Sequence, residues 1–272
     1  GNSVSPDAQR LAVATWDGSL WIYDLSRGTR LKLADGGVVG RRNRPEWSPD
    51  GTKIAYTIED PDNDGAHLYV QAADGTGDAR LLSAAPGETY ARGWTPDSGE
   101  VVFFQYSDIE GLFRVSVAED GPPQPRQLPI QGSRSAVSPD GRWLAYDSGT
   151  TGRSEIYLQP FPDGGAVVPV SSRGGINPRW SSSGTQLYYS FGCQFFAVDI
   201  GPGPELEFGA PRLLFEHCDP SDRRNIGFTV DSEDRFYLLE AVPESGVVTS
   251  LELVQNWDQV LSEALGEGRP GD

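Results

Sequence analysis

The sequence predicts an all-β fold, namely a six-bladed β-propeller of four-stranded antiparallel blades over residues 1–255, with a short C-terminal helix and tail over residues 256–272. Three observations carry this prediction. A strand–turn–strand pattern recurs six times in phase. A third strand follows each copy, and a short fourth strand follows the first five. No helical periodicity interrupts the series before residue 256.

The recurring pattern is clearest in "RPEWSPDGTKIAYT", which begins at Arg44. A strand ends at Trp47, the next four residues have turn chemistry, and β-branched and aromatic residues resume after them. The equivalent turn positions are Asp7, Asp50, Asp97, Asp140, Ser183 and Glu233, at spacings of 43, 47, 43, 43 and 50 residues. A large apolar residue stands three positions before each: Val4, Trp47, Trp94, Val137, Trp180 and Val230.

The segments that complete each unit are also apolar and short. The third strands read "SLWIYDL", "AHLYVQA", "GLFRVSV", "EIYLQPF", "QFFAVDI" and "TSLELVQ", and the fourth strands read "RLKLA", "ARLLSA", "RQLPI", "VVPVSS" and "RLLFE". Repeated four-stranded units without helices are typical of propeller blades, which bury both faces of each sheet by packing around an axis. The sixth copy lacks a fourth strand, so we expect this strand to come from upstream residues or not to exist.

The last predicted element is a helix that begins at Asn256, whose side chain is suited to an N-cap, and ends near Gly266. Its apolar residues share one face: Trp257, Val260, Leu261, Ala264 and Leu265. We expect this face to dock over a propeller edge; the alternative is a helix that binds a partner.

Composition and charge argue against some classes of partner and location. The formal net charge is −17 at pH 7, which argues against nucleic acid as the main partner. No run of 18 apolar residues is present, so we expect no membrane insertion, and no signal peptide is recognisable. The sequence contains no Met, which favours a domain cut from a longer chain or a processed product.

The unit "W-S-P-D-G-x-x-I-A-Y…Y-V" resembles the Pro-Asp repeat of TolB-type propellers, which are relatives of WD40 blades. The stretch "EIYLQPFPDGG…GGINPRWSSSGTQLYYS…GAPRLLF" is similar to propellers joined to bacterial receptor-type Ser/Thr kinases and to transcriptional regulators. The resemblance implies protein–protein interaction outside the cytoplasm, in the periplasm or another extracytoplasmic location, and a sensor role. Ser183 and Glu233 depart from the repeat where the family has Asp.

Arginines are concentrated in the connections that enter the blades, which blade topology places on the face opposite the Ser-Pro-Asp-Gly turns. These connections hold 9 of the 20 arginines. Arg is suited to bidentate binding of carboxylate or phosphate. We therefore predict that a protein, peptide or small anionic ligand is bound by Arg44, Arg92, Arg134, Arg179 and Arg224. The alternative is that the arginines pair with acids of the same face, such as Asp17, Asp60, Asp108 and Glu110.

One loop on that face has the beginning of a calcium-binding pattern. Asp60, Asp62 and Asp64 alternate and precede Gly65, as in the first half of a calcium loop, but Gln71 stands where a bidentate Glu is required. Both a Ca²⁺ site and an ordinary hairpin turn, which favours Asp, Asn and Gly, fit this loop. We expect no other cofactor.

The two cysteines belong to the fifth unit. Cys193 opens its third strand and Cys218 follows its fourth, and antiparallel pairing places the two thiols near each other. They form either a disulfide, which would imply an oxidising compartment, or two free thiols.

The sequence offers no catalytic constellation. The histidines are His67 and His217, and neither a Gly-x-Ser-x-Gly elbow nor a phosphate-binding glycine loop occurs. The regular spacing of the repeated Asp residues favours a structural role in their turns. We therefore predict a non-catalytic binding propeller, the sensor or scaffold part of a larger bacterial protein. The alternatives are an accessory propeller of a peptidase-type hydrolase, and a glycosidase-like enzyme with acids converging on the axis.

Overall fold

The computed structural model describes residues 1–15, 17–35, 45–60, 65–84, 86–118, 121–203, 205–218 and 227–238. These residues form strands, turns and loops. Within them no helix is long and apolar enough to cross a membrane. The all-β part of the prediction is confirmed, whereas the C-terminal helix at 256–272 and the boundary at 255 lie outside the described residues.

Within the described ranges the strands form consecutive antiparallel units, five of which have four strands. Unit 1 comprises β1 (Asn2–Val4), β2 (Arg10–Ala14), β3 (Leu20–Asp24) and β4 (Thr29–Ala34). Unit 2 comprises β5 (Glu46–Trp47), β6 (Lys53–Asp60), β7 (Gly65–Ala72) and β8 (Arg80–Ser83). Unit 3 comprises β9 (Gly87–Trp94), β10 (Glu100–Tyr106), β11 (Gly111–Ser116) and β12 (Arg126–Gln127).

Unit 4 comprises β13 (Ser135–Val137), β14 (Trp143–Ser148), β15 (Glu155–Pro160) and β16 (Val168–Pro169). Unit 5 comprises β17 (Ile176–Trp180), β18 (Gln186–Phe191), β19 (Gln194–Asp199) and β20 (Arg212–Glu216). In unit 6 the described strands are β21 (Phe228–Val230) and β22 (Phe236–Leu238). A short parallel pairing of β7 with β9 joins units 2 and 3 into one eight-stranded sheet.

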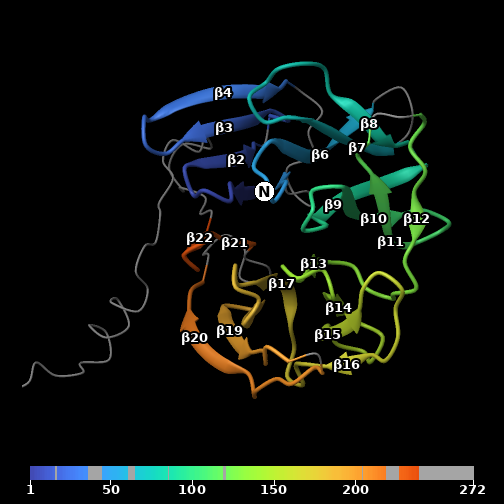
Figure 1. Ribbon diagram of the computed structural model, residues 1–272, viewed down its shortest axis with the longest axis vertical. Coiled ribbons are helices and arrows are strands. Elements are labelled where there is room, and N and C mark those ends of the chain that lie inside the picture. Colours follow the sequence, from blue (N-terminus) through green and yellow to red (C-terminus); the bar gives the residue numbers. More distant parts are fainter. Residues whose placement is uncertain are drawn as a thin grey trace, which may run out of the picture.

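The units surround a common centre, as Figure 1 shows. The first strands of successive units contact one another in the order β1, β5, β9, β13, β17 and β21, and β21 in turn contacts β1. Apolar side chains fill the seams between units; the seam between units 3 and 4, for example, buries Tyr90, Val102, Leu144 and Tyr146. This arrangement is that of a β-propeller.

The tryptophans of the repeat join neighbouring units. The indole Nε1 of Trp47 donates a hydrogen bond to the backbone oxygen of Ser3 at 3.0 Å. Trp94 and Trp180 donate in the same way to Glu46 at 2.9 Å and to Ala136 at 3.0 Å. Each acceptor directly precedes the apolar repeat position of the preceding unit, so the large apolar residue also fixes the position of one first strand against the next.

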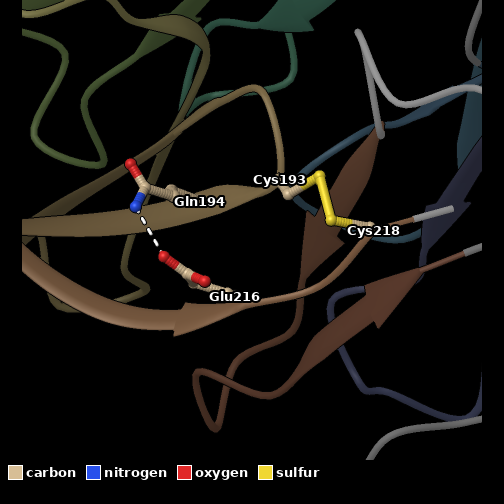
Figure 2. The surroundings of a disulfide bond; sticks show 4 residues. All are labelled: Cys193, Gln194, Glu216 and Cys218. Atoms are coloured by element: carbon tan, nitrogen blue, oxygen red, sulfur yellow. Dashed lines mark hydrogen bonds between the residues drawn. A yellow bond between two sulfur atoms is a disulfide. The ribbon is translucent and has the colours of Figure 1, made fainter.

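A disulfide bond joins Cys193 to Cys218, whose Cα atoms are 4.8 Å apart (Figure 2). Cys193 directly precedes β19 and Cys218 lies beyond β20, and these two strands pair antiparallel. Next to the disulfide, Gln194 Nε2 donates to Glu216 Oε1 at 2.6 Å and the backbone N of His217 donates to the oxygen of Cys193 at 2.8 Å. The bond therefore ties the third strand of unit 5 to its fourth.

The repeated Asp residues hold their own turns together. Asp50 accepts hydrogen bonds from Ser48 Oγ at 2.6 Å and from the backbone N of Thr52 at 2.9 Å. Asp7, Asp97 and Asp140 accept the equivalent pair. The hydroxyl of Thr95 is the main cause of the lowered pKa of Asp97. Burial alone would raise the pKa of the other three carboxyls, but these hydrogen bonds outweigh it and lower the pKa.

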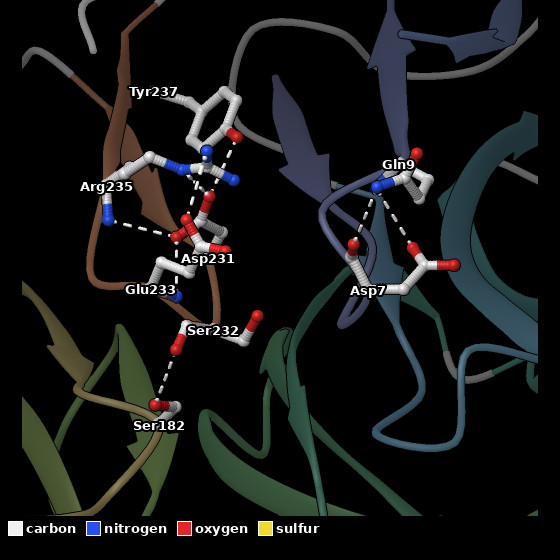
Figure 3. A network of polar contacts seen from close by, with 8 residues as sticks. All are labelled: Asp7, Gln9, Ser182, Asp231, Ser232, Glu233, Arg235 and Tyr237. Atoms are coloured by element: carbon white, nitrogen blue, oxygen red, sulfur yellow. Dashed lines mark hydrogen bonds and ion pairs between the residues drawn. The ribbon is translucent and has the colours of Figure 1, made fainter. Parts of the chain in front are cut away.

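In unit 6 different residues stabilise the equivalent turn (Figure 3). Asp231 stands where the other units have Ser or Thr, and its side chain is fully buried. It accepts hydrogen bonds from the backbone N of Glu233 at 2.8 Å, from Arg235 Nε at 2.6 Å and from the hydroxyl of Tyr237 at 2.8 Å. Across the seam, Ser182 Oγ of unit 5 donates to the oxygen of Ser232 at 2.9 Å.

Candidate functional site

A cavity of about 420 Å³ lies at the centre of the ring. It is lined by the first strands of all six units and by the turns that follow them. Glu46, Arg92, Arg179 and Asp231 are its charged lining residues, and Trp47, Trp94 and Trp180 contribute indole surface. We call this space the axial cavity.

Arg92 lines the axial cavity and lies at an irregularity in the pairing of β9. Val102 pairs with Gly93 and Phe103 pairs with Ala91, which leaves Arg92 as the extra residue of a β-bulge. Bulges change the direction of a side chain relative to a regular strand. Its Nε donates to the backbone oxygen of Ser133 in the next unit at 3.0 Å.

The guanidinium of Arg92 also lies near two aromatic rings. Its central carbon is 5.2 Å from the ring centroid of Tyr90 and 6.0 Å from that of Phe104. Both distances are within the range of cation–π attraction. The side chain is therefore held from two sides and is half-buried.

Arg179 forms an ion pair with Glu46 in the axial cavity. Nη2 of Arg179 is 2.9 Å from Oε1 of Glu46, and the two side chains are 17% and 13% exposed. Glu46 belongs to unit 2 and Arg179 to unit 5, which stand opposite each other in the ring of contacting first strands. The ion pair therefore spans the centre of the propeller.

Arg134 belongs to a network between units 4 and 5. Its Nη1 is 3.0 Å from Oδ2 of Asp147, a carboxylate that is 2% exposed. Asp147 also accepts from Ser133 Oγ at 2.6 Å and from the backbone N of Asn177 at 3.3 Å. Removing Arg134 would leave a buried carboxylate with a missing partner, so this arginine supports the fold.

Three of the five predicted arginines, namely Arg92, Arg134 and Arg179, thus lie near one another. Burial lowers the pKa of Arg92 to about 10, with a further contribution from the positive charge of Arg134 and opposition from Asp147 and Glu46. Arg92 therefore remains charged at neutral pH. Arg44 and Arg224 lie outside the described residues.

The alternative of internal pairing holds for two of the three arginines, but with acids that the sequence did not single out. Arg134 pairs with Asp147 and Arg179 pairs with Glu46. In the described part of the chain, no carboxylate lies within ion-pair distance of Arg92. Glu46 could have been noticed because it directly precedes the Trp of its repeat, whereas Asp147, in a second strand, carries no such signal.

The predicted calcium loop is described only at its ends. Asp60 closes β6 and pairs with Gly65, which opens β7. Asp62 and Asp64 lie outside the described residues. The described residues contain no cluster of three or more His, Cys, Asp or Glu suited to a metal ion. Calcium binding at Asp60, Asp62 and Asp64 stays a prediction.

Comparison with known proteins identifies the family. The family model for the TolB β-propeller domain matches residues 42–198. The chain belongs to this family. The crystal structure of TolB from Acinetobacter baumannii is similar, with a TM-score of 0.57 and 21% identity over 78% of this chain and 56% of that one. At this identity the likeness shows the fold alone.

Two relatives match in sequence over part of their length. The "Uncharacterized peptidase YuxL" of Bacillus subtilis is 25% identical, with 50% of this chain and 26% of that protein covered. "Tricorn protease homolog 1" of Streptomyces coelicolor is 30% identical, with 48% of this chain and 11% of that protein covered. The chain thus spans only a small part of these relatives.

Proposed function

We propose that this TolB-family domain is a non-catalytic binding propeller, which recognises a protein, peptide or small anionic ligand at its axial cavity. The observation that carries the proposal is Arg92. It is a half-buried arginine at the cavity, oriented by Ser133 and two aromatic rings and without a carboxylate partner in the described part of the chain. Such an arginine is suited to binding an acidic group.

The acids of the cavity support binding rather than catalysis. Glu46 is ion-paired with Arg179, and Asp231 is buried among Arg235, Tyr237 and backbone donors. Both carboxylates are thus already engaged by partners within the protein, and neither is left as an unpaired acid in the cavity. This argues against a glycosidase-like mechanism at the axis, where two carboxyl groups with different protonation states are needed.

We further propose that the ring has six blades and that the domain is the sensor or scaffold part of a larger bacterial protein. The closed series of six contacting first strands supports the blade number. The disulfide between Cys193 and Cys218 supports an extracytoplasmic or periplasmic location, since disulfides persist mainly in oxidising compartments. The resemblance to kinase-linked propellers in units 4 and 5 supports the sensor role.

The alternative is an accessory propeller of a peptidase-type hydrolase. The peptidase names of the two partial relatives favour it, although the matched parts are a quarter and a tenth of those proteins. The full-length gene decides between the two. A kinase and a transmembrane helix would support the sensor, and a Gly-x-Ser-x-Gly nucleophile would support the hydrolase.

The test of the binding site is a pull-down from a native extract with wild type and Arg92→Gln. This substitution removes the charge without leaving a described carboxylate unpaired, unlike changes at Arg134 or Arg179. Arg27→Gln is the matched control, because Arg27 is 79% exposed and its only described ion pair, with Asp24, is 3.9 Å long. All three proteins must first unfold at the same temperature. We expect Arg92→Gln alone to lose the partner; equal capture by all three would overturn the axial site.

A further inference from the structure

Glu46 places a carboxylate of the protein itself inside the axial cavity. Its side chain reaches across the centre to Arg179, while its backbone oxygen accepts the indole hydrogen bond of Trp94. The backbone of Glu46 is thus fixed by β5 and by Trp94, and only the side chain is free to leave the ion pair. The molecule therefore already demonstrates that a carboxylate fits in this cavity against an arginine.

Arg92 provides a second place in the cavity where an arginine can bind a carboxylate. Its Nε is used by the oxygen of Ser133. Within the described residues, Nη1 and Nη2 of Arg92 donate to no acceptor. These two nitrogens form the end of the guanidinium fork, whose spacing matches the two oxygens of one carboxylate.

The charges of the cluster also leave room for one anion. Around Arg92, the three arginines Arg92, Arg134 and Arg179 and the two acids Glu46 and Asp147 leave an excess of one positive charge. The other acid that lines the cavity, Asp231, forms an ion pair with Arg235. The cavity volume of about 420 Å³ is within the range of small-ligand pockets. A singly charged carboxylate would balance the cluster, whereas a dianionic phosphate would reverse its sign.

We propose that the ligand group recognised by this propeller is a carboxylate, bound end-on by Arg92, and that Glu46 is its internal competitor for the arginines of the axial cavity. This inference rests on the proposed function and makes it more specific. A ligand carboxylate entering the cavity brings a negative charge close to Glu46, so binding is opposed until Glu46 withdraws from Arg179. Neutralising Glu46 should consequently strengthen binding, an effect opposite to that of removing Arg92.

The probe for the test is acetate, a monoanion at neutral pH, added at constant ionic strength, with inorganic phosphate as the competing anion chemistry. The readout is the set of indole ¹H–¹⁵N signals. Trp47, Trp94 and Trp180 line the cavity, and Trp94 reports directly on Glu46. Trp21 is an internal reference, because it lies on β3 beneath Arg30 and Lys32, and is not among the cavity residues.

The variants are Glu46→Gln, Arg92→Gln, Arg92→Lys and the control Arg27→Gln. We expect acetate to shift the cavity indoles saturably in wild type and in Arg27→Gln, with little movement of Trp21. Glu46→Gln should bind about tenfold more tightly, and both Arg92 variants at least about tenfold more weakly, as expected for one charged hydrogen-bonding group. Phosphate should bind more weakly than acetate.

Three results would overturn the inference: no saturable shift with acetate, unchanged or weaker binding by Glu46→Gln, or tighter binding of phosphate than of acetate. The arm with Glu46→Gln does not depend on the folding of any Arg92 variant. The proposed function has its own separate test in the pull-down. If Arg92→Gln loses the partner but the indole signals do not respond to acetate, the binding propeller stands and the free carboxylate is rejected as its ligand.

Discussion

In every unit, the residue that follows the repeat's turn position (Asp7, Asp50, Asp97, Asp140, Ser183 or Glu233) lies in the left-handed region of backbone conformation. Glycine occupies this position in three units, with φ of 70° at Gly51, 73° at Gly141 and 72° at Gly184. The other three units have Ala8 at 55°, Ser98 at 59° and Asp234 at 61°. The same backbone position is therefore unstrained in three units and strained in three.

The structure allows the energy of this difference to be worked out. A Cβ added at Gly51 would lie 3.7 Å from Cδ of Pro6 and 3.8 Å from Nη2 of Arg10, which are ordinary contacts. The cost of Gly51→Ala is therefore conformational, about 1–2 kcal/mol for an L-residue in this region, less about 0.4–1 kcal/mol gained by restricting the unfolded chain. These ranges leave a net loss of about 0–1.6 kcal/mol, with a centre of about 0.8 kcal/mol, and Ala8→Gly should gain a similar amount.

The assay is urea denaturation of wild type, Gly51→Ala and Ala8→Gly, followed by tryptophan fluorescence. We expect the free energy of unfolding to fall in the first variant and to rise in the second, with unchanged denaturant dependence. Ala8 is preferable to Ser98, whose hydroxyl accepts a hydrogen bond from the backbone N of Asp50. Shifts of the same sign in both variants would refute the reasoning that the two positions share one backbone constraint.

Three further predictions concern the same framework. Trp94→Phe should lower the free energy of unfolding by about 1–3 kcal/mol, since it removes the hydrogen bond to Glu46 and leaves a void; a change no larger than that of Trp21→Phe would contradict this. Hydrogen bonds lower the pKa of Asp97 below 3.8. The contribution of this carboxylate to the free energy of unfolding is therefore present above about pH 4 and is lost as the pH falls through its folded-state pKa. Asp97→Asn should therefore flatten the loss of stability in acid, and an unchanged pH profile would contradict it. Cys193→Ser should lower the free energy of unfolding by about 3 kcal/mol, because it removes a disulfide that joins residues 25 positions apart. If dithiothreitol left the free energy of unfolding of the wild type unchanged, this contribution would be excluded.

Much of the fold could be predicted from the sequence because it is periodic. The turn residues, the apolar position three residues earlier and the third and fourth strands recur in phase, and each repeats a local physical requirement. Cys193 and Cys218 could be placed near each other because antiparallel neighbours bring the start of one strand to the end of the next. The sequence showed that a large apolar residue recurs at the position of Trp47, Trp94 and Trp180, but the hydrogen bonds of these indoles to the preceding unit depend on the seam and have no local signal.

The geometry of the candidate site could be predicted only in part. The sequence indicated that arginines gather at one face, yet it could not distinguish Arg92 from Arg134 and Arg179. That distinction depends on the bulge that gives Arg92 its direction, and on the pairing of Arg179 with Glu46 across 133 residues of sequence. The ion pair follows from closure of the ring, which brings together residues that no spacing rule connects, and the bulge is a register shift between β9 and β10 that the sequence pattern does not mark.

The central claim is that Arg92 in the axial cavity carries ligand recognition. The most direct test is the affinity of the partner captured in the pull-down, measured by isothermal titration calorimetry for wild type, Arg92→Gln and Arg27→Gln. The account predicts that Arg92→Gln loses about ten- to a hundredfold in affinity, as expected for a charged hydrogen-bonding group, while Arg27→Gln binds like wild type. Equal affinities for all three proteins would contradict it and place recognition elsewhere on the propeller.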